Sequence, residues 1–275
     1  MFRFLILCIA FACPIAIVAA NPAKPVVFVS IPPQLYLVKT IGGSLIDTEV
    51  MMKPGESPET FDPSQGQIRA LHDAQLYFRI GVPFEEKWLD GFQDNHVNLK
   101  IVECCSELIG QQSVSLDNHI WTSTRNLQLL AGLIKDELIE LAPEQVAAFE
   151  QNYQALMTQL QDLDTEIRVL LEQRRSDYFF VSHAAFGHFA SDYGLTQVAL
   201  ESEGRQLGAK SLTRIIQKAE QEKISTLFVQ KQHPSASAKA FAHAIKARIV
   251  EVDPLAEDYI ASLRKFATLI GEASP

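Results

Sequence analysis

The stretch DYFFVSHAAFGHFASDYGLTQVALE, residues 177–201, contains two short apolar runs separated by a helix-like segment. Residues 177–183 and 195–201 are rich in aromatic and β-branched side chains, which predicts two strands. The segment 184–193 between them predicts a short helix. Two strands connected through a helix run parallel in one sheet, and the crossover is right-handed. The stretch therefore predicts a parallel α/β sheet.

The same alternation of strand and helix continues on both sides of this stretch. Further β-rich runs cover residues 25–31, 46–52, 75–81, 98–104, 225–230 and 248–253. Segments with helical spacing separate them, including residues 210–222, residues 235–246 and a last helix from Ala256. The expected fold class is α/β, with two parallel-sheet, Rossmann-like lobes over residues 21–142 and 176–275.

A single long helix is predicted between the two lobes, over residues 143–175. Its apolar side chains recur at intervals of four and three, at Phe149, Tyr153, Leu156, Leu160, Leu163, Ile167 and Leu170. Thirty helical residues make a rod of about 45 Å. A heptad-like stripe would also suit a coiled-coil dimer, but this one is short and lies in mid-chain. We expect the helix to pack across both lobes of a monomer.

The first twenty residues, MFRFLILCIAFACPIAIVAA, have the pattern of a secretory signal peptide. An early cation, Arg3, precedes an apolar run, and small residues precede the expected cleavage after Ala20. The run is shorter than the roughly 20 residues of a membrane-spanning helix. An uncleaved anchor is the alternative. We therefore expect an exported, periplasmic or otherwise extracytoplasmic protein.

The composition limits the ligands and the chemistry of the chain. Its 275 residues carry a formal net charge of −9 without a basic cluster, which argues against nucleic acid and suits a cationic ligand. The chain lacks the H-E-x-x-H and G-x-S-x-G signatures of hydrolases. Beyond the signal peptide, Cys104 and Cys105 are the only cysteines, and the sequence leaves open whether they are buried thiols or a strained disulfide.

Histidines and carboxylates follow four of the predicted strands. His183 and Asp253 end the first and last strands of the second lobe, and Glu59 and His119 lie in loops after the second and fourth strands of the first. Ligands of open parallel sheets bind where such loops converge, beyond the carboxyl ends of the strands. Two imidazoles and two carboxylates suit zinc or manganese. The sequence therefore predicts a metal site between the lobes.

Each of these residues also has an ordinary structural interpretation. His183 could cap the segment after its strand, Asp253 could begin a turn before Pro254, and Glu59 could be a solvated loop residue. His233 also follows a predicted strand, and we consider it an accessory site. The remaining histidines are expected to lie outside the site, and they are His72, His96, His188 and His243.

Four segments, in the same order along the chain, resemble motifs of the metal-binding solute receptors of zinc and manganese ABC importers. PGESPETFDPS is similar to the P-G-x-S-P-H loop of that family, and DNHIW to its D-x-H-x-W motif. SHAAFGHFASDYGL is similar to the S-H-x-A-[FL]-x-[YH]-F element, and VDPLAEDYIASLRK to the D-P-L segment. The resemblance covers nearly the whole chain beyond the signal peptide.

The resemblance implies a receptor without enzymatic activity, with two lobes bridged by a helix and a metal held between them. His119, His183 and Asp253 match the metal ligands of the family, and Glu59 stands where most relatives have a histidine. Zinc is the favoured ion, with manganese second, and the partner would be a membrane permease of an ABC transporter. The alternatives are a receptor for a metal chelate and, as the second of the two, a zinc-dependent hydrolase.

Overall fold

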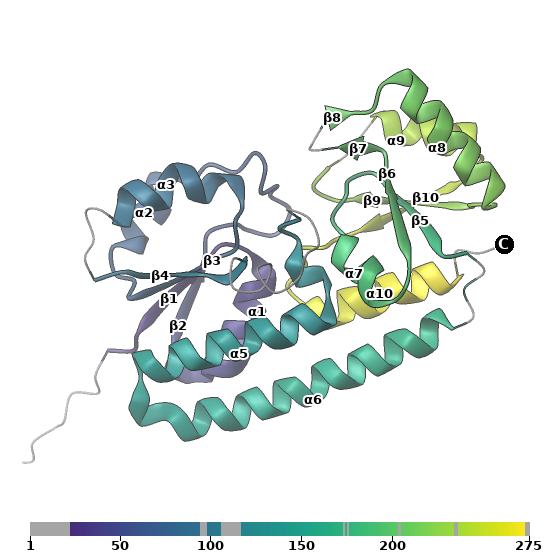
Figure 1. Ribbon diagram of the computed structural model, residues 1–275. Helices are drawn as coiled ribbons and strands as arrows, with labels where there is room; N and C mark the ends of the chain where they lie inside the picture. Colours follow the sequence, from purple (N-terminus) through teal and green to yellow (C-terminus); the bar gives the residue numbers. More distant parts are fainter. Residues whose placement is uncertain are drawn as a thin grey trace, which may run out of the picture.

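The computed structural model of the protein describes residues 23–93, 98–105, 117–172, 174, 176–202, 205–233 and 236–272. The predicted signal peptide, residues 1–20, and His96 lie outside these residues. Within them the chain forms two α/β lobes above a layer of long helices (Figure 1). In this part of the chain no helix has both the length and the apolar character needed to cross a membrane.

The first lobe is a four-stranded parallel sheet with the order β2-β1-β3-β4. Its strands are β1 (Val26–Val29), β2 (Asp47–Val50), β3 (Leu76–Arg79) and β4 (Lys100–Glu103). The connecting helices are α1 (Pro32–Gly42), α2 (Gln65–Leu71) and α3 (Pro83–Gln93), with a short 3-10 turn, η1 (Gly43–Leu45), after α1. All four predicted strands of this lobe are present.

The second lobe has a four-stranded parallel sheet with the order β10-β9-β5-β6. Its strands are β5 (Tyr178–Val181), β6 (Thr196–Ala199), β9 (Thr226–Gln230) and β10 (Arg248–Val252), again at the predicted places. Its helices are α7 (Gly187–Asp192), α8 (Ala209–Gln221) and α9 (Ala236–Ala244). Numbered along the chain within each lobe, both sheets have the order 2-1-3-4, so the two lobes share one topology.

One small element of the second lobe is not predicted from the sequence. Strands β7 (Glu201–Ser202) and β8 (Arg205–Gln206) pair antiparallel beyond the end of β6. Two-residue strands are too short to show a period of two, so the apolar pattern contains no signal for them.

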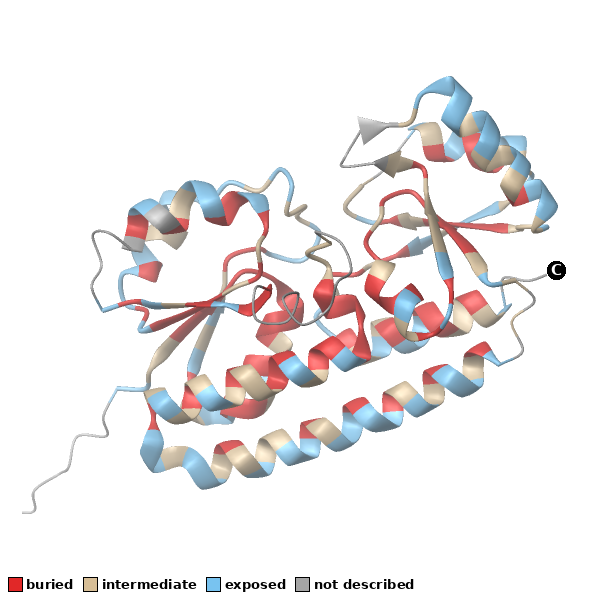
Figure 2. Cartoon of the chain, in the orientation of Figure 1, coloured by how far each residue is buried: buried red, intermediate tan, exposed pale blue. Residues whose placement is uncertain are grey.

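Three long helices lie beneath the two sheets. They are α5 (Thr124–Leu141), α6 (Val146–Leu171) and α10 (Tyr259–Glu272), with 3-10 turns η2 (Ile120–Thr122) before α5 and η3 (Pro143–Gln145) before α6. Helix α6 packs against α1 and α5 of the first lobe and against α10 of the second. Its apolar stripe is therefore covered by its own chain, as predicted, and the outer face remains exposed (Figure 2).

The helix α6 approaches α10 closely at Gly271. A Cβ atom there would lie 2.7 Å from the backbone oxygen of Leu170, so a residue with a side chain would force the helices apart. One continuous group of buried apolar residues includes Phe28 of the first sheet, Leu160 of α6 and Val181 of the second sheet. The two lobes therefore share a core, which favours small relative movements over free hinge motion.

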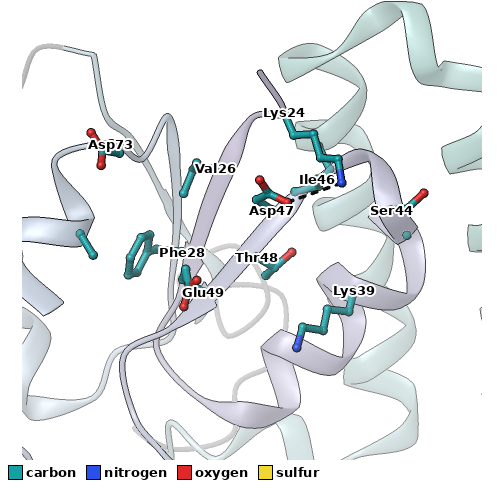
Figure 3. A pocket seen from close by; sticks show the side chains of 12 residues that line it. Lys24, Val26, Phe28, Lys39, Ser44, Ile46, Asp47, Thr48, Glu49 and Asp73 are labelled. Carbon is teal, nitrogen blue, oxygen red and sulfur yellow. Dashed lines mark ion pairs between the residues drawn. The ribbon is translucent and has the colours of Figure 1, made fainter. Parts of the chain in front are cut away.

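A hollow of about 670 Å³ lies beside the edge strand β2, near the amino ends of the first sheet (Figure 3). Lys24 and Asp47, which both line it, form an ion pair with Nζ and Oδ1 3.8 Å apart, and both side chains are exposed. An exposed pair of this kind contributes little to stability. The hollow lies at the opposite end of the sheet from the predicted metal ligands.

Candidate metal centre

A cavity of about 710 Å³ lies between the lobes, at the carboxyl ends of both sheets. The first lobe lines it with Glu59 and His119, and the second with His183 and His233. In the second sheet β5 and β9 are neighbours, and the chain crosses in opposite directions from them, so the loops after these strands diverge around a crevice. His183 and His233 come from the two loops that flank this crevice.

Glu59 reaches the cavity from the loop that follows β2. Turn hydrogen bonds shape this loop: the amide of Lys53 donates to Glu56 Oε2 (2.7 Å), and the amide of Glu59 donates to Ser57 Oγ (3.3 Å). Ser64 ends the loop by capping α2, where its Oγ accepts from the amide of Gln67. The Glu59 side chain is 36 % exposed, so its carboxylate faces both the cavity and solvent.

Glu59 faces two histidines of the opposite lobe. Its Oε1 lies 3.4 Å from His183 Nε2, and its Oε2 lies 3.9 Å from His233 Nδ1. One ligand atom from each of these three residues lies within 4.8 Å of the others, a spacing that one metal ion could bridge. The carboxylate and the imidazoles therefore meet from both sides of the cleft.

His119 stands at the amino end of η2, directly before the turn into α5. Its Nδ1 lies 2.7 Å from Asp117 Oδ1, and its amide donates to the same oxygen at 3.0 Å. Burial raises the pKa of Asp117, but the hydrogen bonds and the charge interaction with His119 outweigh burial and hold that pKa below its ordinary value. An ionised Asp117 accepts the Nδ1 proton and leaves Nε2 of His119 as the nitrogen that can bind metal.

His183 lies two residues after the end of β5 and is 7 % exposed. Burial lowers the pKa of His183 to about 4, and the neighbouring His119 and His233 contribute to the lowering. The imidazole is therefore neutral near pH 7 and needs to lose no proton before it binds a metal ion. The rings of His119 and His183 have centroids 5.4 Å apart and meet edge to face.

His233 follows β9, and its ring stacks on that of His183 with centroids 4.6 Å apart and planes within 8°. Its Nε2 lies 3.3 Å from Ser57 Oγ of the first lobe. From the sequence, His233 is expected only as an accessory site. The signal that could have found it is its place after a strand that neighbours β5, but strand order cannot be seen in the sequence.

Asp253 lies apart from Glu59, His119 and His183. It follows β10, the edge strand of the second sheet, and its Oδ1 accepts from Gln232 Nε2 (2.6 Å) and from the amide of Leu255 (2.9 Å). It borders a separate cavity of about 310 Å³, and among the described residues it is not part of the lining between the lobes. The structure thus brings Glu59, His119 and His183 together and places Asp253 in a turn.

The other histidines that the structure describes lie outside the cluster. His188 Nε2 is 2.8 Å from the backbone oxygen of Asp117, so this residue joins α7 to the His119 loop. His72 packs edge to face on Phe92, and His243 lies in the last turn of α9.

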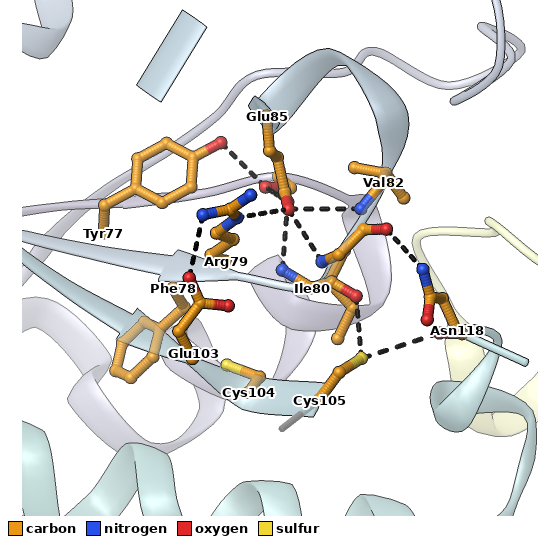
Figure 4. Close-up of polar contacts among 12 residues, drawn as sticks. Tyr77, Phe78, Arg79, Ile80, Val82, Glu85, Glu103, Cys104, Cys105 and Asn118 are labelled. Carbon is orange, nitrogen blue, oxygen red and sulfur yellow. Dashed lines mark hydrogen bonds and ion pairs between the residues drawn. The ribbon is translucent and has the colours of Figure 1, made fainter. Parts of the chain in front are cut away.

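A buried glutamate supports the first-lobe wall of the cavity (Figure 4). The sequence suggests an ordinary first-turn position for Glu85, yet its side chain is fully buried. It accepts hydrogen bonds from the amides of residues 80–82 at 2.7–3.1 Å and from the Ser30 hydroxyl. Burial raises the pKa of Glu85, and these hydrogen bonds act against the rise. The backbone oxygen of Gly81, in the loop that Glu85 holds, accepts from Asn118, the neighbour of His119.

The two cysteines beneath this loop are buried free thiols, which decides between the alternatives left open by the sequence. Cys105 Sγ donates to the backbone oxygen of Ile80 at 2.7 Å. Burial raises the pKa of Cys105 to about 12 and that of Cys104 well above its usual value. Both thiols therefore belong to the core and not to the metal cluster.

Two similar α/β lobes on a helical spine, with imidazoles and a carboxylate facing one another across the cleft, define the helix-bridged class of solute-binding receptors. The family model described as "ZnuA: Zinc-uptake complex component A periplasmic" matches residues 27–273. Since this is most of the chain, the protein belongs to that family, and the resemblance seen in the motifs is confirmed.

Individual relatives agree with this assignment. A crystal structure of ZnuA is 31 % identical, with a TM-score of 0.84, and the match covers 91 % of this chain and 99 % of that one. The zinc-binding protein TroA of Treponema pallidum is 26 % identical over 241 residues, 84 % of this chain and 78 % of its own. The manganese-binding lipoprotein MntA of Halalkalibacterium halodurans is 23 % identical over 203 residues, 70 % of this chain and 67 % of its own.

Proposed function

We propose that the protein captures a divalent transition metal ion outside the cytoplasm and delivers it to the membrane permease of an ABC importer. Zinc is the favoured ion and manganese the second candidate. The family and the metal named for its relatives, zinc for TroA and manganese for MntA, support this proposal. The predicted signal peptide, residues 1–20, supports export to the periplasm, and the self-covered stripe of α6 supports a monomer.

The observation that carries the proposal is the pair formed by Glu59 and His183 across the cleft. Their Oε1 and Nε2 atoms are 3.4 Å apart. Two ligands of one tetrahedral zinc ion, each at about 2.0–2.1 Å, are about 3.3 Å from each other. The two side chains therefore stand at the separation that a shared ion requires, although they come from different lobes.

Capture at such a site needs no bond chemistry in the protein. The cation loses water and gains the Glu59 carboxylate together with the imidazoles of His119 and His183. Asp117 holds the His119 ring in place and adds negative charge behind it. Because the ligands come from both lobes, the bound ion ties the lobes together, and the permease would recognise this loaded form.

The ligand set is part of the proposal. Glu59, His119 and His183 form its common core, and Asp253 is the fourth ligand expected from the sequence. In the structure the Oδ1 atom of Asp253 accepts hydrogen bonds from Gln232 and from the Leu255 amide, and its carboxylate would have to turn toward the cleft to bind the ion.

Calorimetry on the metal-free, signal-free protein tests the proposal. We expect one zinc ion per chain, and His183→Ala should weaken binding by at least about 100-fold because it removes a direct ligand. His243→Ala, on α9 and outside the cluster, is the matched control and should bind as the unaltered protein does. Absence of binding of both zinc and manganese to the unaltered protein would overturn the function. Assays for ester and peptide hydrolysis by the zinc-loaded protein should give no turnover.

A further inference from the structure

We propose that His233, in place of Asp253, is the fourth metal ligand, which makes the centre a site of three histidines and Glu59 that selects zinc over manganese. The inference rests on the proposed function, since it names the ligand that decides which ion this receptor holds. It is carried by strand order, by the hydrogen bonds of the candidate ligands, and by the chemistry of the resulting donor set.

Strand order places His233 beside the cluster and Asp253 away from it. His183 follows β5 and His233 follows β9, and these two strands are hydrogen-bonded neighbours in the middle of the sheet. Asp253 follows β10, which lies beyond β9 at the sheet edge. Neighbouring parallel strands end about 4.8 Å apart, whereas strands two places apart end about 10 Å from each other. His233 can therefore share an ion with His183 without a change in the backbone.

The hydrogen bonds of the histidines leave one nitrogen of each for the ion. A metal-binding histidine usually donates its second ring nitrogen to a protein oxygen, which fixes the ring and the tautomer. His119 has Asp117 at Nδ1, 2.7 Å away, and His233 has Ser57 at Nε2, 3.3 Å away. The remaining nitrogen of His233, Nδ1, faces Glu59 Oε2 at 3.9 Å. Both rings thus have the supporting partner of a ligand.

The carboxylate of Asp253 already serves the turn that presents His233. Gln232, the residue before His233, donates to Asp253 Oδ1 at 2.6 Å, and the Leu255 amide donates to the same atom. The backbone amide of His233 donates to the oxygen of Gln230, which closes the turn after β9. One short turn therefore directs His233 toward the cleft and holds Asp253 away from it. Asp253 acts as a structural partner of this turn.

The exchange of an oxygen donor for a nitrogen donor alters the metal preference. Two imidazoles and two carboxylates would offer an oxygen-rich shell that neutralises the dication, which manganese accepts well. Three imidazoles and one carboxylate leave a net positive centre with nitrogen donors, the set that zinc favours in tetrahedral sites. The presence of Glu59 at the first position then keeps one anionic ligand in a site that would otherwise contain neutral nitrogens only.

The test compares zinc and manganese binding, by competition with a chelator of known affinity, in the unaltered protein and three variants. His233→Ala should weaken zinc binding by at least about 100-fold, because it removes a direct ligand. Asp253→Asn, which retains an acceptor oxygen for the Leu255 amide, should change zinc affinity by less than about threefold. His233→Asp should shift the zinc-to-manganese affinity ratio toward manganese by at least about tenfold.

X-ray absorption of the zinc-loaded, unaltered protein gives a readout that does not depend on how the variants fold. We expect three imidazoles bound to the zinc ion. A zinc ion bound by two imidazoles and two carboxylates, as expected with Asp253 as the fourth ligand, would overturn the inference. Loss of affinity in Asp253→Asn with retained affinity in His233→Ala, or retained affinity in both, would also overturn it. These results differ from failure of the proposed function, in which the unaltered protein would bind neither zinc nor manganese.

Discussion

His188 Nε2 lies 2.8 Å from the backbone oxygen of Asp117, so the helix after β5 holds the loop that presents His119 in the other lobe. Gly187, the preceding residue, makes the approach possible. A Cβ atom at Gly187 would lie 2.6 Å from Asp117 Oδ2. The carboxylate that orients His119 therefore occupies space that only a glycine leaves open.

Substitution Gly187→Ala should consequently weaken zinc binding without unfolding the protein. The new methyl group would displace Asp117 from His119, and loss of such a supporting carboxylate costs about 10- to 100-fold in metal affinity. Calorimetry measures the loss, and circular dichroism monitors the fold. Gly66→Ala in α2 is the matched control, because a Cβ there has ordinary contact with Ser64 Oγ at 3.8 Å. Equal affinities of the two variants would show that Asp117 tolerates the displacement.

Substitution Glu85→Gln should destabilise the first lobe. The amides of residues 80–82 and the Ser30 hydroxyl all donate to the Glu85 carboxylate. The carboxamide of glutamine would replace one accepting oxygen with an NH2 group, which would face these donors in a buried position. An unsatisfied buried group costs about 1–3 kcal/mol. Urea denaturation measures the change. Glu86→Gln, one residue further and exposed, should leave the midpoint unchanged. A midpoint for Glu85→Gln equal to that of Glu86→Gln would contradict the role of this network.

The sequence predicts the elements of this fold well because each is recorded locally. The run VVFV becomes β1 and the run YFFV becomes β5, since a buried parallel strand needs a short, continuous apolar segment. The rule that ligands bind at the carboxyl ends of strands then leads to Glu59, His119 and His183 without coordinates. These residues do line one cavity.

The position of His233 in the cavity between the lobes, and of Asp253 beside a separate cavity, could not be predicted in the same way. Both follow a strand of the second lobe, and only the hydrogen-bonded order β10-β9-β5-β6 tells which strand neighbours β5. That order depends on contacts between segments far apart in the chain. The burial of Glu85 could not be predicted for a related reason. It depends on Ser30 and on residues 80–82, whereas the sequence neighbours of Glu85 resemble an exposed helix start.

The thiols of Cys104 and Cys105 should react with a thiol reagent only when the protein unfolds. Burial is the main cause that raises the pKa of Cys105 to about 12, and the charge of the nearby Glu85 is the second cause. Burial also raises the pKa of Cys104 well above its usual value. Because the thiolate is the reactive form, labelling at pH 8 should be at least about 100-fold slower in buffer than in urea. Rapid labelling of the native protein by a chromogenic disulfide would contradict the buried position of both residues.

Asp164 of α6 should make folding stability depend on pH in acid. Thr124 and Tyr193 donate to its Oδ1 at 2.9 and 2.8 Å, and Arg168 donates to its Oδ2 at 2.9 Å. Burial raises the pKa of Asp164, but the hydrogen bonds from Arg168, Tyr193 and Thr124 outweigh it and hold that pKa below its usual value.

A carboxyl whose pKa is lower in the folded than in the unfolded protein stabilises the fold above its unfolded pKa, and this contribution disappears as the pH falls through the folded pKa. Asp164→Asn should therefore cost about 1–3 kcal/mol at pH 7, and the difference from the unaltered protein should shrink below about pH 4. Urea denaturation at pH 7 and pH 3 measures both values, with exposed Asp162→Asn as the control. A destabilisation of equal size at both pH values would mean that Asp164 acts through packing and not through its charge.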